Sequence, residues 1–325
     1  MMRLAVQRRQ WPVELLIIPT TAALLAYLFP SQLGLLTQIA TTSLMILALD
    51  VVVGYAGIVT LGHAAFFGLG AYAAGIYAMK IVSEPLSGLL VGGIVGCAVA
   101  LLTGTIVLRA RGLSLIMMTI AVAQIVLEIA NKARWLTGGD DGLSGIEMSP
   151  LLGIFEFDFT GRTALVYSVA VLTISMFILR LVMRSAFGLT CVGIREDRLR
   201  MSAMGCDVKR HLLVAYGLGG LFAGIAGALS AQTVQVVGLH SLSFTTSAEA
   251  LVMLILGGTG RLWGALIGTL LFMTIHHVAA ELDPFRWMLT IGVILIVVVL
   301  VAPGGVVNSV IALRRRFARK EVANV

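Results

Sequence analysis

Residues 86–107 read LSGLLVGGIVGCAVALLTGTIV and contain no charged side chain. A helix needs about 20 such residues to cross the hydrocarbon core of a bilayer, so this stretch predicts a membrane span. The whole chain has the same character, because 59% of its 325 residues are hydrophobic and 12% are charged. An ordinary soluble domain carries about 25% charged residues. This composition excludes disorder, collagen, a coiled coil and a DNA-binding domain, and predicts an all-α polytopic membrane protein.

The apolar runs predict about ten spans, and the chain divides near Gly161 into two halves of five spans each. The first half (1–162) ends in a loop at 131–162. The second half (163–325) holds a long loop at 184–212 and a basic tail at 304–325. Five spans per half make the halves inverted relative to each other, as in many transporter folds. The expected spans are 13–29, 34–53, 64–82, 86–107, 113–130, 163–183, 213–237, 247–258, 262–281 and 287–303.

The charges predict the orientation of these spans. If the N-terminus lies inside and the spans alternate, 17 of the 23 basic residues fall on the inner side. The positive-inside rule then places the loop 184–212, the tail and both termini in the cytoplasm, and the loop 131–162 outside. The inner basic residues are Arg3, Arg8, Arg9, Arg109, Arg111, Arg184, Arg195, Arg198, Arg200, Lys209, Arg210, Arg261, Arg314, Arg315, Arg316, Arg319 and Lys320.

Glycine recurs at four-residue spacing in three stripes. Small residues at this spacing let helices approach closely in a membrane, where lipid gives no hydrophobic drive between them. Packing within one chain is the favoured interpretation, and a seam between two subunits is the alternative. The stripes are Gly88, Gly92, Gly96, Ala100 and Gly104; Gly220, Gly224 and Ala228; and Gly260, Gly264 and Gly268.

Breaks rich in glycine and hydroxyl side chains interrupt the spans in both halves, at 54–63 and at 238–260. Broken segments in equivalent positions of two repeats point to a transport pathway. Intramembrane carboxylates are functional candidates by default; Asp50, Glu128 and Glu249 qualify, with helix-end anchoring as the equal alternative. The candidate pathway residues are Gly54, Tyr55, Gly57, Thr60, Gly62, His63, Glu249, Gly257 and Gly258.

Motifs for catalysis, metal and nucleotide binding are absent from the sequence. None of the three cysteines has CxxC spacing, and no P-loop, HExxH or Ser/His/Asp pattern occurs. The net charge of +7 comes mostly from basic residues at the ends of apolar runs, where they act as topology signals rather than as a nucleic-acid surface. We therefore expect no catalytic residue, metal site, cofactor or nucleic-acid partner.

The loop 184–212 contains a segment, 194–205, that predicts a short helix. Glu196 and Asp197 suit a helix N-terminus, and Gly205 suits the position just beyond the C-terminus. Glu196 and Arg200 are spaced for an i, i+4 ion pair. A helix this short is marginal in water, so it must pack against its own subunit or a partner. The residues alone favour its own subunit.

Four blocks of the chain together resemble the branched-chain amino acid ABC transporter permeases of the LivM and LivH type. The block 54–72, GYAGIVTLGHAAFFGLGAY, resembles the family signature, and 137–145, TGGDDGLSG, looks like the external loop of the LivM branch. Phe187-Gly188-Leu189, followed by 194–197 and 203–205, resembles the cytosolic coupling segment. The block 257–264, GGTGRLWG, matches a fourth stretch, and the blocks keep the family order.

The resemblance implies the permease subunit of an ATP-driven importer in the bacterial inner membrane. Its partners would be a second homologous permease, two cytosolic ATPase subunits and an external, periplasmic solute-binding protein. The resemblance reverses the preference for the loop helix, which becomes a coupling helix seated in an ATPase groove. The segment departs from the broader importer pattern in lacking a downstream proline. The coupling residues carried over are Arg195, Glu196, Asp197, Ala203, Met204 and Gly205.

The substrate and two other functional classes remain open at this stage. The family includes permeases for branched-chain amino acids and others associated with urea, amides and further amino acids. A zwitterionic amino acid would place its carboxylate at a half-helix N-terminus, and Glu249 is a candidate partner for its ammonium. One alternative is a secondary carrier coupled to an ion through Asp50, Glu128 or Glu249. The other is a membrane scaffold without a pathway.

Overall fold

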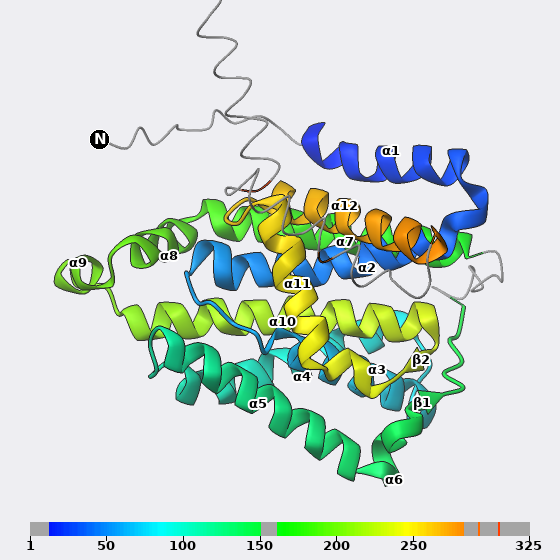
Figure 1. The fold of residues 1–325 in the computed structure, drawn as a ribbon, viewed down its shortest axis with the longest axis horizontal. Helices are drawn as coiled ribbons and strands as arrows, with labels where there is room; N and C mark the ends of the chain where they lie inside the picture. Colours follow the sequence, from blue (N-terminus) through cyan, green and yellow to red (C-terminus); the bar gives the residue numbers. More distant parts are fainter. Residues whose placement is uncertain (1–12, 151–160, 283–291, 293–304, 306–325) are drawn as a thin grey trace, which may run out of the picture.

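The computed structural model describes residues 13–150, 161–282, Gly292 and Gly305. The chain forms an all-α bundle with one two-stranded ladder outside it (Figure 1). The long helices are α1 (Val13–Leu28), α2 (Leu33–Asp50), α3 (His63–Lys80), α4 (Pro85–Val107), α5 (Leu113–Lys132), α7 (Arg162–Arg184), α10 (Val208–Val234), α11 (Phe244–Gly257) and α12 (Leu262–Leu282). The shorter elements are η1 (Pro30–Gln32), η2 (Val51–Tyr55), α6 (Arg134–Thr137), η3 (Gly139–Asp141), β1 (Leu143–Ser144), α8 (Ala186–Glu196), α9 (Arg198–Ala203), β2 (Val236–Val237) and η4 (Leu239–Leu242).

Six of these helices are long and apolar enough to cross a membrane, which confirms a multi-pass helical membrane protein. They are Leu33–Tyr55, Pro85–Val107, Leu113–Lys132, Arg162–Arg184, Val208–Val234 and Leu262–Glu281. Each of the first nine predicted spans coincides with a helix to within a few residues. Apart from Gly292 and Gly305, the tenth predicted span (287–303) and the basic tail lie outside the described residues, as do the N-terminal arginines. The number of ten therefore stays a prediction.

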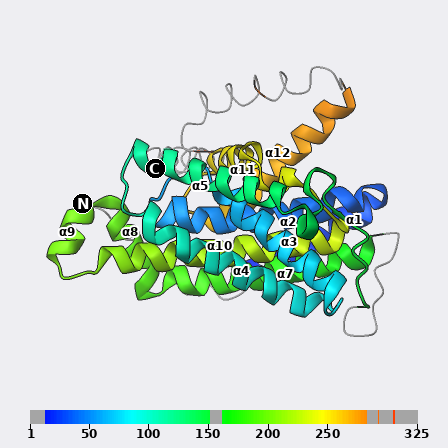
Figure 2. The ribbon, with the colours of Figure 1, turned by 90° about the horizontal axis from the view of Figure 1, so that it is seen from below.

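Helix α10 occupies the centre of the bundle, where it packs against α3 and α4 on one side and α2 on another (Figures 1 and 2). Glycines bring α4 and α10 together: a β-carbon on Gly96 would overlap the carbonyl of Gly220, and one on Gly224 would overlap that of Gly92. This close approach gives van der Waals contact between backbones. The stripes of α4 and α10 thus pack against each other within one chain, as the favoured interpretation expected.

The third stripe serves the same purpose between α11 and α12. β-Carbons on Gly264 and Gly268 would run into the backbone of Gly257, and that on Gly268 also into the carbonyl of Met253. The alternative of a subunit seam is therefore wrong for these two glycines as well. Their small size is needed inside the chain.

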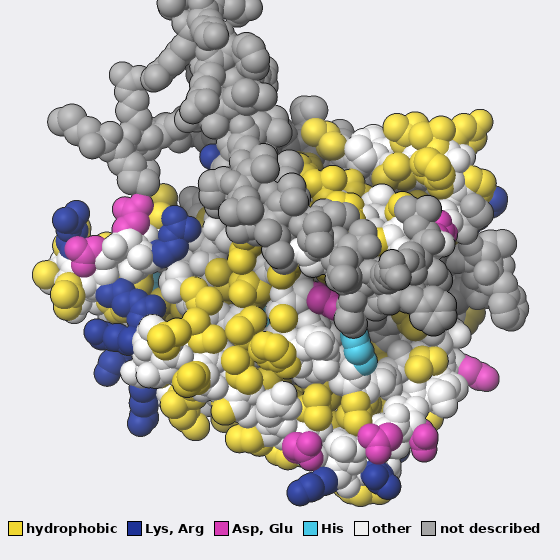
Figure 3. Space-filling view, viewed as in Figure 1, with side chains coloured by type: hydrophobic (Ala, Val, Ile, Leu, Met, Phe, Trp, Pro, Cys, Tyr) yellow, Lys and Arg dark blue, Asp and Glu magenta, His cyan; other side chains and the backbone are white. Residues whose placement is uncertain are grey.

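Charge divides the bundle into two ends. Arginine and lysine side chains gather where α8, α9 and the start of α10 project from the bundle, whereas acidic side chains mix with fewer basic ones near α6 (Figure 3). We call the first end, with α8, α9, the α4–α5 turn and the α11–α12 turn, the basic end. Its described basic residues include Arg109, Arg111, Arg184, Arg195, Arg198, Arg200, Lys209, Arg210 and Arg261.

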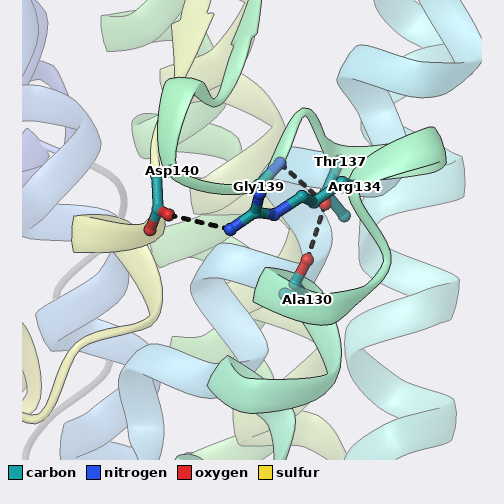
Figure 4. A network of polar contacts seen from close by, with 5 residues as sticks. All are labelled: Ala130, Arg134, Thr137, Gly139 and Asp140. Atoms are coloured by element: carbon teal, nitrogen blue, oxygen red, sulfur yellow. Dashed lines mark hydrogen bonds and ion pairs between the residues drawn. The ribbon is translucent and has the colours of Figure 1, made fainter.

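At the opposite end, the loop that follows α5 folds back on the bundle. The Thr137 hydroxyl donates to the Ala130 carbonyl (2.6 Å) and accepts from the Gly139 N–H (3.2 Å), while Arg134 Nη2 lies 3.5 Å from Asp140 Oδ2 (Figure 4). The exposed ion pair adds little stability. Strand β1 then pairs antiparallel with β2, which follows α10. This ladder ties the loop of the first half to the second half.

The α4–α10 contact gives the first prediction. Gly224→Ala places a methyl group against the Gly92 backbone, which cannot yield without separating the helices, and overpacking costs about 1–3 kcal/mol. Gly34→Ala is the matched control because a β-carbon on Gly34 meets nothing within 4 Å. We expect thermal unfolding of the detergent-solubilised chain, followed by circular dichroism, to show a lower Tm for Gly224→Ala and an unchanged or slightly higher one for Gly34→Ala. Equal Tm values for both variants would contradict the assigned packing.

Candidate functional site

A buried carboxylate joins the two halves at the basic end. Asp50, the last residue of α2, is fully buried, and its Oδ1 accepts a hydrogen bond from the Gly260 N–H at 2.7 Å. Gly260 belongs to the turn between α11 and α12. A side chain of the first half therefore holds a backbone turn of the second half in place. Such a buried charge persists only where partners compensate its desolvation.

The end of α2 is shaped to allow this contact. Its last turn widens into the π-helical turn η2, a form that recurs at functional sites. Gly54 lies in this turn, and a β-carbon there would overlap both the Asp50 carboxylate and the Gly260 nitrogen. Any residue larger than glycine at position 54 would break the contact between Asp50 and Gly260.

Arg195, near the end of α8, reaches the same place. Its Nη1 donates a hydrogen bond to the carbonyl of Gly54. Gly57 has a φ of 69°, and a β-carbon there would lie 2.5 Å from Arg195 Cγ. Gly260 has a φ of 77°, and its β-carbon would lie 3.1 Å from Arg195 Nη1. Both glycines leave room for the arginine and adopt a backbone conformation that other residues rarely take.

Three segments that are far apart in the sequence thus meet at one point. The signature glycines come from 54–57, the arginine from the predicted coupling segment and the turn from the 257–260 block. Gly257 and Gly258 contribute close packing there, because a β-carbon on Gly257 would overlap the Gly264 carbonyl. We call Asp50, the Gly54 carbonyl, the Gly260 N–H and Arg195 the polar node.

A second group lies deeper, where α3 begins. The Ala64 N–H donates to Ser247 Oγ of α11 at 2.9 Å, so the first turns of α3 and α11 lie side by side. Thr60 Oγ1 accepts from the Gly62 N–H (3.2 Å) and fixes the turn into α3. His63 is fully buried, with its ring edge-on to Phe66. Within the described part of the chain, neither of its ring nitrogens has a hydrogen-bond partner.

The structure brings together only part of the predicted pathway set. Gly54 and Gly57 lie at the node, and Gly257 and Gly258 pack against Gly264 of α12 just before Gly260. Thr60, Gly62 and His63 form the deeper group. Tyr55 is half-buried beside Gly54, and Glu249 is half-buried on α11, two residues beyond Ser247. Glu249 makes no hydrogen bond or ion pair with any described residue. Glu128 is exposed on α5, far along the chain from both groups.

Sequence reasoning missed the roles of Gly260 and Ser247, and treated Asp50 as an isolated carboxylate. One signal was available: Asp50 and Gly54 are four residues apart and therefore share a helix face. Nothing in the sequence reveals the partner of Asp50, because the two bonded residues are 210 positions apart.

The prediction of one helix over 194–205 was wrong. Helix α8 ends at Glu196, Asp197 is extended (φ −153°), and α9 starts at Arg198. The cause is Asp197, whose Oδ1 accepts from the Arg200 N–H at 3.0 Å and so caps a new helix. The same capping replaces the expected Glu196–Arg200 pair, since Arg200 Nε lies 3.7 Å from Asp197 Oδ2.

The predicted end of this helix is confirmed. Gly205 has a φ of 84°, its N–H bonds to the Ser202 carbonyl, and the Cys206 N–H bonds to the Met201 carbonyl. This is the Schellman pattern that closes a helix. Helix α9 has no buried residue; Leu199 in the helix and Met204, its C-cap, are 79% and 75% exposed. Only Met201 packs inward, next to Gly193.

Comparison with known proteins identifies the family of the chain. The model of the family described as "Branched-chain amino acid transport system / permease component" matches residues 31–302. The chain belongs to this family. It is therefore a multi-pass protein of the inner membrane, of the kind that forms the permease component of ABC transporters.

Individual relatives point to the LivM branch. The high-affinity branched-chain amino acid transport system permease protein LivM of Escherichia coli (strain K12) is 27% identical over 280 residues, which cover 80% of this chain and 66% of LivM. The matched region thus spans just under two thirds of that relative. The corresponding LivH protein of Salmonella typhimurium is 24% identical over 180 residues, covering 54% of this chain and 53% of LivH. No solved structure showed significant similarity.

The fit of Arg195 against the signature gives the second prediction. Gly57 and Gly112 both have a positive φ, which costs an alanine about 1–2 kcal/mol at either site. Only at Gly57 would the added methyl group also press on Arg195, because Gly112 has open space around it. We expect Gly57→Ala to lower the Tm of the purified chain by clearly more than Gly112→Ala does. Equal losses would show that Arg195 does not pack on Gly57.

Proposed function

We propose that the chain is the permease subunit of an ATP-driven importer for branched-chain or closely related amino acids. It forms the translocation pathway with a second, homologous permease and receives its substrate from an external binding protein. The relatives support this proposal, because both LivM and LivH are described as high-affinity branched-chain amino acid transport system permease proteins. The observation that carries it is the polar node, where the family signature meets the segment that resembles a coupling loop.

Helix α9 is the proposed docking site for the ATPase subunits. It extends beyond the end of the bundle in both views (Figures 1 and 2). Its exposed Leu199 and Met204 are apolar side chains without a described partner in the bundle, which suits insertion into a groove on another protein. The remaining predicted coupling residues, Glu196, Asp197, Ala203 and Gly205, shape and close this helix.

The charge distribution supports a cytoplasmic position for α8 and α9. Basic residues are concentrated at their end of the bundle, as the positive-inside rule requires of cytoplasmic segments. The loop 131–162 then lies outside, where a binding protein would deliver substrate, and both termini lie in the cytoplasm. ATPase binding through α9 would support the same orientation, since the ATPases are cytosolic.

The packing supports two inverted halves of five spans. If α1 to α4 correspond to α7, α10, α11 and α12, the second helix of each half packs against the third and fourth helices of the other: α10 on α3 and α4, and α2 on α11 and α12. A polar side chain of each second helix also holds the start of the opposite fourth helix. Asp50 does so at Gly260, and Gln232 Nε2 does so at the Pro85 carbonyl (2.8 Å).

The deeper group is the proposed substrate region. The N-termini of α3 and α11 meet there, and the partial positive charge of a helix N-terminus favours a substrate carboxylate. Glu249, close by on α11, would face the ammonium group. In this proposal Thr60, Gly62, His63 and Glu249 contact the substrate, while Gly54, Tyr55, Gly57, Gly257 and Gly258 form the inner gate.

Reconstitution tests the proposed function. The chain, its pairing permease, the ATPase subunits and the binding protein are placed together in proteoliposomes, and leucine uptake is measured. We expect uptake only with ATP and binding protein, because the chain carries no P-loop of its own. Uptake driven by an ion gradient without ATP would instead establish the secondary carrier.

The same assay tests the substrate region. Glu249→Gln removes the charge proposed to pair with the substrate ammonium, and losing a charged hydrogen bond costs about 1.5–3 kcal/mol. We expect a KM for leucine raised about 10-fold or more. Glu128→Gln is the matched control, since Glu128 is exposed on α5. An unchanged KM for Glu249→Gln would remove Glu249 from the pathway.

Substitution in α9 tests the ATPase contact. Leu199→Asp places a charge at the centre of the proposed contact, so we expect loss of ATPase subunits from the purified complex. Leu199 contributes nothing to the buried core, so the permease itself should still insert and be recovered in normal yield. Trp135→Asp is the control: Trp135 is 81% exposed on α6, at the opposite end. Retention of the ATPases by Leu199→Asp would refute docking at α9.

A further inference from the structure

Arg195 occupies the junction between the projecting segment and the bundle. Helix α8 is anchored to the bundle, because Gly188, Cys191 and Ile194 are buried. Arg195 follows directly and stands three residues before the first residue of α9. Displacement of α9 relative to the bundle would therefore act on the backbone next to Arg195, as well as on the connection to α10 that follows Ala203.

The arginine touches both halves at once. Its guanidinium bonds to the Gly54 carbonyl at the end of α2, and it lies against Gly260 in the α11–α12 turn. Asp50 completes the arrangement, since its Oδ1 holds the Gly260 N–H and its charge lies within electrostatic reach of Arg195. Asp50 Oδ2 has no hydrogen-bond partner among the described residues. Arg195 thus places a positive charge near this buried carboxylate and beside the turn that the carboxylate holds.

We propose that Arg195 is a positioning residue that transmits movement of the α8–α9 segment to the gate, by making or breaking the polar node. The inference rests on the proposed function. With Arg195 in place, the ends of α2 and the α11–α12 turn are held together and the basic end is closed. Withdrawal of Arg195 leaves Asp50 buried without its counter-charge, so the carboxylate either takes up a proton or gains water as the helices separate.

The chemistry of the contact calls for arginine rather than for any cation. A guanidinium presents five donors in a planar fork, so it can bond the Gly54 carbonyl while facing a carboxylate. A lysine ammonium is a compact point charge on a flexible chain and cannot span the two groups in the same way. Arg195→Lys therefore keeps the positive charge and removes the planar guanidinium, so it tests whether the shape of the group matters apart from its charge.

The test uses the complete reconstituted complex, in which leucine uptake and ATP hydrolysis are measured together. We expect Arg195→Met to hydrolyse ATP at close to the wild-type rate and to transport about tenfold less leucine per ATP, within the range usual for coupling between sites. Arg195→Lys should recover less than half of this loss. Arg109→Met is the matched control, because Arg109 lies at the same end but donates only within its own helix region, to the Thr105 carbonyl. The Arg109→Met complex should transport as much leucine per ATP as the wild type does.

A second variant keeps the test independent of folding at position 195. Asp50→Asn retains an oxygen that can accept the Gly260 N–H and loses only the charge, so it should assemble and lower the transport-to-ATP ratio. The double variant Arg195→Met with Asp50→Asn should be no worse than the poorer single variant, since both substitutions disable the same proposed polar node.

The outcomes separate the inference from the proposed function. A wild-type ratio in assembled Arg195→Met or Asp50→Asn complexes, or losses that multiply in the double variant, would overturn the role of Arg195. If the wild-type complex itself shows no ATP-dependent uptake, the proposed function fails, whatever the variants do. If the Arg195→Met complex does not assemble, the amount of leucine transported per ATP by the Asp50→Asn complex decides whether the polar node couples ATP hydrolysis to transport.

Discussion

The structure depends on backbones that touch where glycine removes the side chain. Lipid is as apolar as leucine, so helices in a bilayer gain little from hiding apolar surface and must hold together by close contact and polar bonds. Gly92, Gly96 and Gly224 bring α4 against α10 until carbonyls and α-carbons meet. Gly54 and Gly260 use the same principle at the polar node, where a backbone, a carboxylate and an arginine share a space that a methyl group would fill. The absence of a glycine side chain thus permits both the helix packing and the contacts of the polar node.

Features that depend on local sequence could be predicted, and features that depend on long-range contact could not. The helices were predictable because a bilayer requires long apolar runs, and the stripes because i, i+4 glycines share a face. Gly205 was predictable as a helix end because its chemistry is local. The break at Asp197 was missed because capping by Asp197 outweighed the i, i+4 pairing of Glu196 with Arg200. The β1–β2 ladder and the Asp50–Gly260 bond join remote residues, so no local pattern could reveal them.

The node also bears on the choice between an ATP-driven permease and an ion-coupled carrier. A coupling carboxylate in a carrier has to bind a cation and release it in each cycle. Asp50 is fully buried, one of its oxygens is occupied by a backbone N–H, and an arginine already supplies the positive charge. A transported metal cation such as Na⁺ would have to compete at this carboxylate with a guanidinium that cannot lose its own proton. The arrangement suits a residue that holds two helices together better than one that exchanges ions.

Two polar contacts join the first and second halves of the chain, Gln232 with Pro85 and Asp50 with Gly260. They differ in charge in a way that fits a pathway driven from one side. At the end away from α8 and α9, Gln232 bonds the Pro85 carbonyl and accepts from the Tyr167 hydroxyl at 2.8 Å, so that tie is made of neutral groups and needs no counter-charge. At the basic end, the contact is made by a buried carboxylate, whose negative charge costs free energy unless a cation lies near. In the role proposed for Arg195, the strength of this contact depends on where α8 places that side chain. In the proposed arrangement of two inverted halves, the amide of one contact is replaced at the basic end by a carboxylate with an arginine near it, so that only this end would respond to movement of α8.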